Sequence, residues 1–156
     1  MKVRFATLDD IDATVEMGRA MIKETRYKSY DFNGERFGST LKGIIESERG
    51  AHCLFVASNA EDQIIGCLIG CVEQHIFSEE PVASVVVFGV LPKYRMGGAG
   101  LKLLTAFKKW AENRGAIEIT AGVSSGIDLG KMDTFLRKLG FQLTGGNYSM
   151  QLGAGQ

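Results

Sequence analysis

The fold is decided by one stretch of the sequence, Val90-Leu91-Pro92-Lys93-Tyr94-Arg95-Met96-Gly97-Gly98-Ala99-Gly100-Leu101. An apolar run at 82–90 precedes this stretch, and a run with helical periodicity follows it. Pro92 ends the strand because it has no N–H to give to a ladder. The next backbone amides open a helix and have no acceptors within that helix. The stretch is therefore expected to turn from a buried strand into a helix with its amides facing outwards.

Such a turn favours an anion, because the positive end of the helix dipole lies behind the amides of residues 96–100. Glycine at 97, 98 and 100 would let a pyrophosphate approach the backbone without a Cβ in the way. Arg95 adds a positive charge beside the turn. The simpler alternative is a flexible turn that only caps a helix.

Two common phosphate-binding loops fit this stretch poorly. No glycine here is followed by the G-K-[ST] ending of the P-loop. The dinucleotide fingerprint G-x-G-x-x-G opens a parallel sheet, whereas this stretch reads G-G-A-G after runs that are expected to be antiparallel.

The rest of the chain predicts a mixed sheet. Strands are expected over 3–5, 53–57, 64–72, 82–90 and 117–123, with a terminal hairpin of 141–143 and 148–152. Helices are expected after a capping box at 7–10, over 35–48, from 101 to about 112 and over 133–139. The third of these is expected to carry on its apolar, inward face Leu101, Leu104, Phe107 and Ala111. Short polar links make the central strands an antiparallel meander, and the segment 82–123 adds one parallel crossover. The predicted class is α+β, with one bent, mostly antiparallel sheet and helices on both faces.

The composition of the chain limits the kinds of protein that it can be. The 156 residues suit a single domain, expected over 1–152 with a disordered tail at 153–156. The 18 basic and 18 acidic residues cancel, which argues against general attraction to nucleic acid or a membrane surface. Three cysteines without a paired spacing indicate a reducing compartment, and with no apolar leader or spanning run we expect a cytoplasmic protein. The His, Cys and Asp residues do not have the spacing of metal ligands, so no metal site is expected.

The motif Arg95-x-x-Gly98-x-Gly100 resembles the R/Q-x-x-G-x-G/A signature of the GNAT family of N-acetyltransferases. A second segment is similar to that family's aromatic, short helix and L/M-G-F pattern: Phe135-Leu136-Arg137-Lys138-Leu139-Gly140-Phe141. The order of expected elements matches the family over about residues 2–152. The resemblance implies a single acyltransferase domain that uses acetyl-CoA.

The resemblance also implies how acetyl-CoA would be held. In the family a bulge splays the central strand from its neighbour, and the pantetheine arm inserts there. The backbones of Phe88 and Val90 would contact this arm, and the Val90 amide would polarise the thioester carbonyl. The pyrophosphate would lie on Arg95 and on the amides of Met96, Gly97, Gly98, Ala99 and Gly100. Ser124 and Ser125 follow a strand end near the splay and would touch the cofactor or water, or else cap a turn.

The catalytic groups depart from the family pattern. The usual general acid, a Tyr in the second motif, is replaced by Leu136, and no Glu stands in the central strand at 83–86. Candidates are Tyr148 as the acid and Glu73 or His75 as proton acceptors. The simpler interpretation of Glu73 and His75 is a polar residue on the surface of a strand, and that of Tyr148 is a packed aromatic ring with its hydroxyl outward. The expected activity is direct attack by a primary amine on the thioester, with no covalent enzyme intermediate.

Two alternatives stay open at this point. A non-catalytic acyl-CoA-binding module is favoured by Leu136 in the acid position, and a dimeric interaction domain would use the fold only as a scaffold. The acceptor, a small-molecule or protein amine, is expected over 23–40, 74–81 and 144–148. Four aromatic residues there would form a wall for it or would seal two helices against the sheet: Tyr27, Tyr30, Phe32 and Phe37. Pairing of terminal strands across two copies would give a homodimer.

Overall fold

The computed structural model describes residues 1–122 and 128–153 of the chain. It divides into two compact units, Met1–Ala121 and Gly122–Gln156, which are described in turn. The first unit holds the sheet strands β1 (Lys2–Phe5), β2 (His52–Ser58), β3 (Ile64–Gln74), β4 (Pro81–Val90) and β5 (Ile119–Ala121). It also holds the helices α1 (Ile11–Ile22), α2 (Gly34–Glu46) and α3 (Ala99–Asn113).

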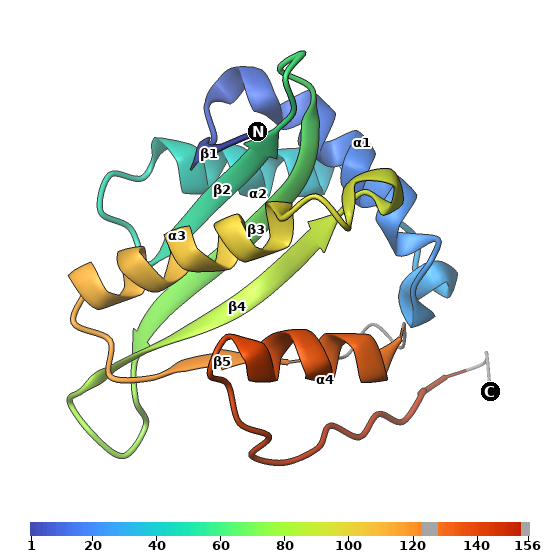
Figure 1. The fold of residues 1–156 in the computed structure, drawn as a ribbon. Helices are drawn as coiled ribbons and strands as arrows, with labels where there is room; N and C mark the ends of the chain where they lie inside the picture. Colours follow the sequence, from blue (N-terminus) through green and yellow to red (C-terminus); the bar gives the residue numbers. More distant parts are fainter. Residues whose placement is uncertain (123–127, 154–156) are drawn as a thin grey trace. The chain divides into compact units, whose positions relative to one another are not determined.

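The five strands form one sheet in the order β1-β2-β3-β4-β5 (Figure 1). Strands β1 to β4 pair antiparallel with their neighbours, and β5 pairs parallel with β4. The parallel pair follows from the chain path, because α3 carries the chain from the end of β4 back to its start. The predicted α+β class, with a mostly antiparallel sheet, is confirmed.

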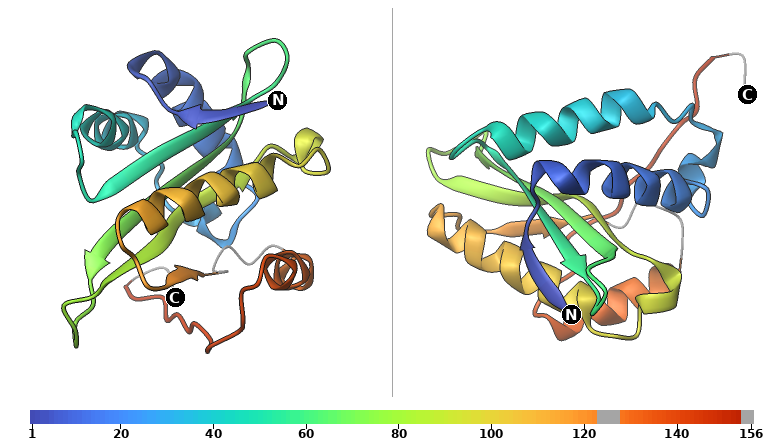
Figure 2. Two further views of the ribbon diagram at one scale, coloured as in Figure 1. Left: turned by 60° about the vertical axis from the view of Figure 1, so that its left-hand side comes forward. Right: turned by 90° about the horizontal axis from the view of Figure 1, so that it is seen from above.

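Helices cover both faces of the sheet, with α1 and α2 on one face and α3 on the other (Figure 2). Because successive side chains of a strand point to opposite faces of the sheet, the sequence determines which residues face which helices. Four strand residues face α1 and α2 and pack with the buried Met17 and Leu41: Leu54, Val56, Cys67 and Ile69. On the other face a side chain at position 70 would overlap the buried ring of Phe107 from α3.

The predicted capping box is confirmed, and it caps the 3-10 segment η1 (Leu8–Asp10) that leads into α1. The Thr7 amide donates to the Asp10 carboxylate at 2.7 Å, and the Thr7 hydroxyl lies 3.3 Å from the same oxygen. Arg4 of β1 adds two charge-assisted bonds to Asp10, at 2.6 and 3.0 Å. This arrangement lowers the pKa of Asp10, chiefly through the bond from Arg4, and ties the first strand to the first helix.

Helix α3 begins within the glycine-rich stretch and buries Leu103, Leu104, Phe107, Trp110 and Ala111. The periodicity had pointed to Leu101 as the first inward leucine, but its side chain is 46% exposed, whereas Leu103 is fully buried. The helix starts at Ala99, and from that start the 3.6-residue repeat turns position 103 towards the sheet.

The second unit contains α4 (Leu129–Lys138), which starts four residues earlier than predicted because Asp128 accepts from the Lys131 amide. Gly140 ends it at a φ of +94°, with the Phe141 amide donating to the Leu136 carbonyl. The predicted hairpin of 141–143 and 148–152 is wrong: no strand forms in described residues 141–152. The side chains that alternate along this segment are exposed, and the alternation by itself does not supply a neighbouring strand to pair with. Of the predicted tail 153–156, residues 154–156 lie outside the described part.

Among the described residues, no helix is long and apolar enough to cross a membrane.

Candidate cofactor and active site

Strand β4 carries a bulge in its middle. Ile69 of β3 faces Val87 and the next residue, Gly70, faces Val85, so Val86 is the extra residue on β4. The Val86 side chain is 55% exposed. The resemblance implied a bulge in the central strand, and the register places it two residues before Phe88.

The pairing of β4 with β5 ends at the same point. Among the residues that the structure describes, β5 pairs with β4 at Ala83, Ser84 and Val85 and goes no further. The last part of β4, which contains Phe88 and Val90, keeps its pairing with β3 through Leu68 and Gly66. The edge of β4 that faces β5 is thus left without a parallel partner strand after the bulge. An extended ligand could lie along this edge of β4.

The loop after β4 leads into four backbone amides at the start of α3, those of Met96, Gly98, Ala99 and Gly100, which together are called the amide cradle. A short 3-10 segment, Pro92–Tyr94, leads to Gly98, which caps α3 with a φ of +86°, a conformation that favours glycine. Within the described residues no backbone acceptor is present for the amides of Met96, Gly98, Ala99 and Gly100. These four amides stand at the positive end of a 15-residue helix.

One of the predicted donors is already used. The Gly97 amide donates to the Tyr94 carbonyl at 3.2 Å, so it helps to shape the loop. The Tyr94 and Arg95 amides likewise donate back, to the Leu91 and Pro92 carbonyls. The loop is therefore held by its own hydrogen bonds before any ligand arrives.

Arg95 is engaged by two partners. Its Nε donates to the Val90 carbonyl at 2.9 Å, and its Nη2 lies 2.8 Å from a carboxylate oxygen of Glu24, just after α1. Figure 1 shows the loop at the N-terminal end of α3 beside this end of α1. No local sequence pattern predicts this ion pair, because Glu24 and Arg95 are 71 positions apart.

The structure does not bring Glu73 and His75 to this loop. Glu73 pairs in register with Val82, eight residues before Val90, which is about 26 Å along a strand. The His75 Nδ1 accepts from the Phe77 amide at 3.0 Å in the turn between β3 and β4. Both residues are exposed and lie at the opposite end of the sheet from the loop.

The remaining candidates belong to the second unit. The Tyr148 side chain is fully exposed, and Leu136 lies in α4. Ser124 and Ser125 lie outside the described residues.

The three cysteines are free thiols without features of a nucleophile. Burial raises the pKa of Cys53 and of Cys67 to about 12, and it also raises the pKa of Cys71. Since the thiolate is the reactive form, the buried Cys53 and Cys67 are expected to stay protonated and unreactive, and Cys71 to be less reactive than an unperturbed thiol.

At pH 8, a colorimetric disulfide reagent is expected to leave Cys53 and Cys67 of the native protein unmodified and to react slowly with Cys71, the most accessible of the three. Unfolding in guanidinium should release all three thiols. Rapid labelling of Cys67 in the native protein would contradict the burial that raises its pKa.

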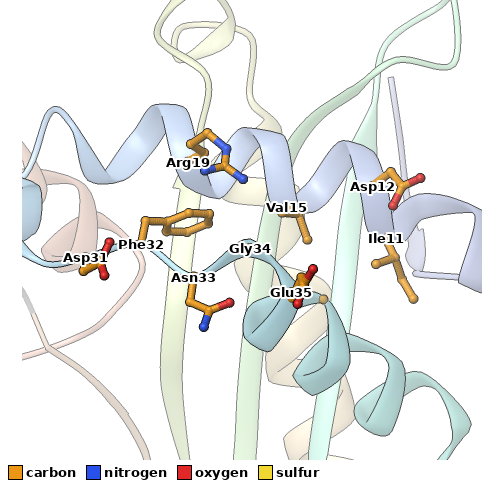
Figure 3. A pocket seen from close by; sticks show the side chains of 10 residues that line it. Ile11, Asp12, Val15, Arg19, Asp31, Phe32, Asn33, Gly34 and Glu35 are labelled. Atoms are coloured by element: carbon orange, nitrogen blue, oxygen red, sulfur yellow. The ribbon is translucent and has the colours of Figure 1, made fainter.

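A pocket of about 520 Å³ opens between α1 and the segment before α2 (Figure 3). Arg19 lies over the Phe32 ring at 4.8 Å, and three carboxylates join the lining: Asp12, Asp31 and Glu35. Helical spacing places Asp12 and Arg19 on the side of α1 opposite to Met17 and Met21, which turn towards the sheet. The pocket thus lies on the outer face of the helix pair and not on the β4 edge.

The four aromatic residues of 23–40 divide into two pairs. Phe37 packs against Gly18 and Phe32, which seals α1 against α2, while Tyr27 and Tyr30 make an edge contact in the connection. The sealing role considered for this cluster thus holds for Phe32 and Phe37.

No group of three or more His, Cys, Asp or Glu side chains in the described part of the chain is placed to hold a metal ion.

The comparison with curated proteins found no match.

Solved structures share the fold at low sequence identity. An acetyltransferase from Trypanosoma brucei superposes with a TM-score of 0.75 at 16% identity, over 97% of this chain and 99% of that one. A transcriptional regulator from Bacillus halodurans gives 0.77 at 19%, over 97% and 99%. An aminoglycoside 6'-N-acetyltransferase from Acinetobacter baumannii gives 0.73 at 16%, over 98% of both chains.

A sequence model of the acetyltransferase (GNAT) family matches residues 19–141, which is more than half of the chain and includes both sequence motifs. The match includes the bulged strand β4, the point where its pairing with β5 ends and the glycine-rich turn at the start of α3. The chain is therefore an acyltransferase, and it belongs to the acetyltransferase (GNAT) family.

Proposed function

We propose that the chain transfers an acetyl group from acetyl-CoA to a primary amine by direct attack of the amine. The observation that carries this proposal is the continuity of one binding path. The edge of β4 loses its parallel partner at the bulge, and the same strand leads through Pro92 into the amide cradle. A ligand with an extended arm and a pyrophosphate would match this path.

The residues present fit such a ligand. The amides of Met96, Gly98, Ala99 and Gly100 would hold the pyrophosphate, with Gly97 shaping the loop. The backbones of Phe88 and Val90 would line the arm, and Ser124 and Ser125 are proposed as further contacts. When bound, acetyl-CoA supplies the activated acetyl thioester. The bond from nitrogen to the acetyl carbon forms as the carbon–sulfur bond breaks, and the proton lost by the amine balances the one taken up by the thiolate.

Replacing Glu24 with Gln is expected to raise the affinity for acetyl-CoA by about two- to fivefold, because an exposed ion pair is worth about 0.2–1 kcal/mol. The substitution frees Arg95 from the bond at 2.8 Å and removes a negative charge beside the cradle. Isothermal titration at two salt concentrations measures the effect, which should shrink at high salt. Replacing Glu16, which pairs with Arg19 on the same helix, is the matched control. Weaker binding of acetyl-CoA by the Glu24 variant would contradict the idea that Glu24 competes with the cofactor for Arg95.

We infer that proton transfer depends more on positioning than on a strong base within the sheet. Tyr148 stays the candidate acid, since its hydroxyl is exposed and the usual acid position holds Leu136. Glu73 and His75 could accept a proton only from an amine that enters near the β3–β4 turn, about 26 Å along the strand from Val90.

The Tyr148→Phe variant is expected to lower kcat by about 10- to 100-fold and to leave the Kd for acetyl-CoA unchanged if this hydroxyl protonates the leaving thiolate. The rate of free thiol release at saturating cofactor measures kcat. The Tyr30→Phe variant, on another exposed tyrosine, is the control. An unchanged kcat would remove Tyr148 from the mechanism.

The second candidate function is a non-catalytic acyl-CoA-binding module of the same fold, and Leu136 in the acid position is the observation that favours it. Both functions predict cofactor binding. Incubation with labelled acetyl-CoA and a panel of small and peptide amines distinguishes them, because only the enzyme passes the label to an amine.

The acceptor is proposed to be a small-molecule amine or a protein amine. One solved structure of similar fold is an aminoglycoside 6'-N-acetyltransferase, which makes an aminoglycoside a sensible first compound in the panel.

We also propose that residues 1–152 act as one domain, since the family match runs from the first unit into the second. Three free cysteines agree with a reducing, cytoplasmic location. A homodimer is a further proposal, to be tested by sedimentation.

A further inference from the structure

A second pocket, of about 200 Å³, lies at the end of α3 that is remote from the cradle. It opens where β1 ends and where β2 begins at His52, between the last turns of α2 and α3. The lining includes Phe5 from β1, Ile45 from α2 and Trp110 from α3. Trp110 and Arg114 lie about 16 and 22 Å along the helix from the first residue of α3, so the pocket is distinct from the proposed cofactor path.

The polar side chains of this pocket are strongly biased in charge. Two guanidinium groups, of Arg49 and Arg114, line it together with the imidazole of His52 and the hydroxyl of Ser47, and its lining includes no carboxylate. Neither arginine makes an ion pair with any described residue. The whole chain is neutral, so the bias is local. Two guanidinium groups that line one pocket without a carboxylate in its lining favour an anion.

Arg114 is held in place by the protein. Its guanidinium lies over the Trp110 ring, 4.7 Å from the ring centre, and its Nη1 donates to the Gly50 carbonyl at 2.9 Å. These contacts leave further N–H groups of the fork for a ligand. Because these contacts already order the Arg114 side chain, little further side-chain entropy would be lost when an anion binds to it.

Arg49, the second arginine of the lining, has an uncommon backbone conformation. Its φ of +55° lies in the left-handed region, in the turn that ends α2. In that turn the Gly50 amide donates to the Ser47 carbonyl at 3.2 Å. A non-glycine residue in this region costs free energy, and the turn keeps an exposed, unpaired guanidinium at the rim of the pocket.

The floor of the pocket is apolar. Leu54, Cys53 and Trp110 are 3%, 3% and 8% exposed, and the Cys53 thiol is neutral because burial raises its pKa to about 12. A volume of 200 Å³ corresponds to about seven waters, or to one ring with a head group. We propose that this pocket binds a small aromatic anion, a single-ring carboxylate or phosphate, with its ring on the apolar floor and its charge between Arg49 and Arg114.

The chain carries its own reporter for this site, because Trp110 is its only tryptophan. Titration of the full chain with phenyl phosphate and with benzoate is expected to change the Trp110 emission in a saturable way. Benzyl alcohol tests the ring without the charge, and inorganic phosphate tests the charge without the ring. Both should bind at least about tenfold more weakly than the aryl anions.

Two variants make the test specific. Arg49→Ala removes an exposed side chain without a partner, so the fold should be unaffected, and we expect affinity for phenyl phosphate to fall by about tenfold or more. Arg114→Lys keeps the charge but loses the planar fork, and should weaken binding by a similar factor. Melting curves of both variants check the fold. Gly98→Asp, which alters the distant cradle, should bind phenyl phosphate as the wild type does.

The outcomes separate this site from the cofactor site. Saturable binding that is lost in Arg49→Ala and kept in Gly98→Asp supports the proposal. Equal binding by wild type and Arg49→Ala would overturn it, as would equal binding of benzyl alcohol and phenyl phosphate. Loss of binding in Gly98→Asp alone would assign the anion to the cradle and would also overturn the proposal.

Discussion

Replacing Gly98 with Asp is expected to weaken acetyl-CoA binding by about 100-fold or more. The position caps α3 at a φ of +86° and stands among four amides that lack backbone acceptors within the described residues. An Asp carboxylate there would bond to those amides itself and would repel a pyrophosphate. Adjacent like charges cost several kcal/mol, and each 1.4 kcal/mol or so is a factor of ten in affinity. Isothermal titration with acetyl-CoA measures the loss.

Two further variants separate charge from shape. Gly98→Asn has nearly the same volume as the Asp variant and tolerates the left-handed backbone, so it should fold equally well and lose less affinity. Gly43→Asp places the same charge on α2, where a new side chain meets no atom within 4 Å, and should bind as the wild type does. Full affinity in Gly98→Asp with an unchanged melting curve would remove the pyrophosphate from this loop.

Replacing Phe107 with Ala is expected to lower the free energy of unfolding by about 3–5 kcal/mol, the usual cost of removing a buried phenylalanine ring. Phe107 is fully buried and packs over Gly70, on the strand opposite the bulge. A Cβ at position 70 would lie 2.7 Å from two ring atoms and closer still to a third. This pair therefore fixes α3, and with it the cradle, on the bulged part of the sheet. Denaturant unfolding measures the loss.

A double-mutant cycle tests the pairing itself. Gly70→Ala should destabilise the wild type, because the Phe107 ring has to move, and should cost far less in the Phe107→Leu background. Leu104→Ala is the control background, since a change there leaves the Phe107 ring in place over Gly70. Additive free energies in the Phe107→Leu background would show that the two residues do not constrain each other.

The sequence was sufficient for features that depend on local chemistry. Pro92, Gly98 and the amphipathic run after them predict a strand, a turn with free amides and a helix, and the structure shows this order. Apolar runs separated by short polar links likewise predict the antiparallel meander. The bulge at Val86 had no local signal of its own and was available only through the resemblance.

Features that depend on distant contacts were not predictable in this way. No local rule connects Glu24 to Arg95, or Arg114 to the Gly50 carbonyl, across 71 and 64 positions. The inward leucine of α3 shifted from 101 to 103 because the helix begins at Ala99. The terminal segment 141–152 has the alternation of a hairpin, but its side chains are exposed and the described residues supply no ladder partner.

The central claim is that the loop at the start of α3 binds acetyl-CoA through its pyrophosphate, and melting curves test it most directly. Acetyl-CoA at about 100 times its Kd stabilises the folded chain by about 2.7 kcal/mol, which corresponds to a rise in Tm of several degrees for a chain of this size. We predict this rise with acetyl-CoA, little change with ATP or NAD, and no rise for Gly98→Asp. An unchanged Tm at millimolar acetyl-CoA, or an equal rise with all three ligands, would contradict the account.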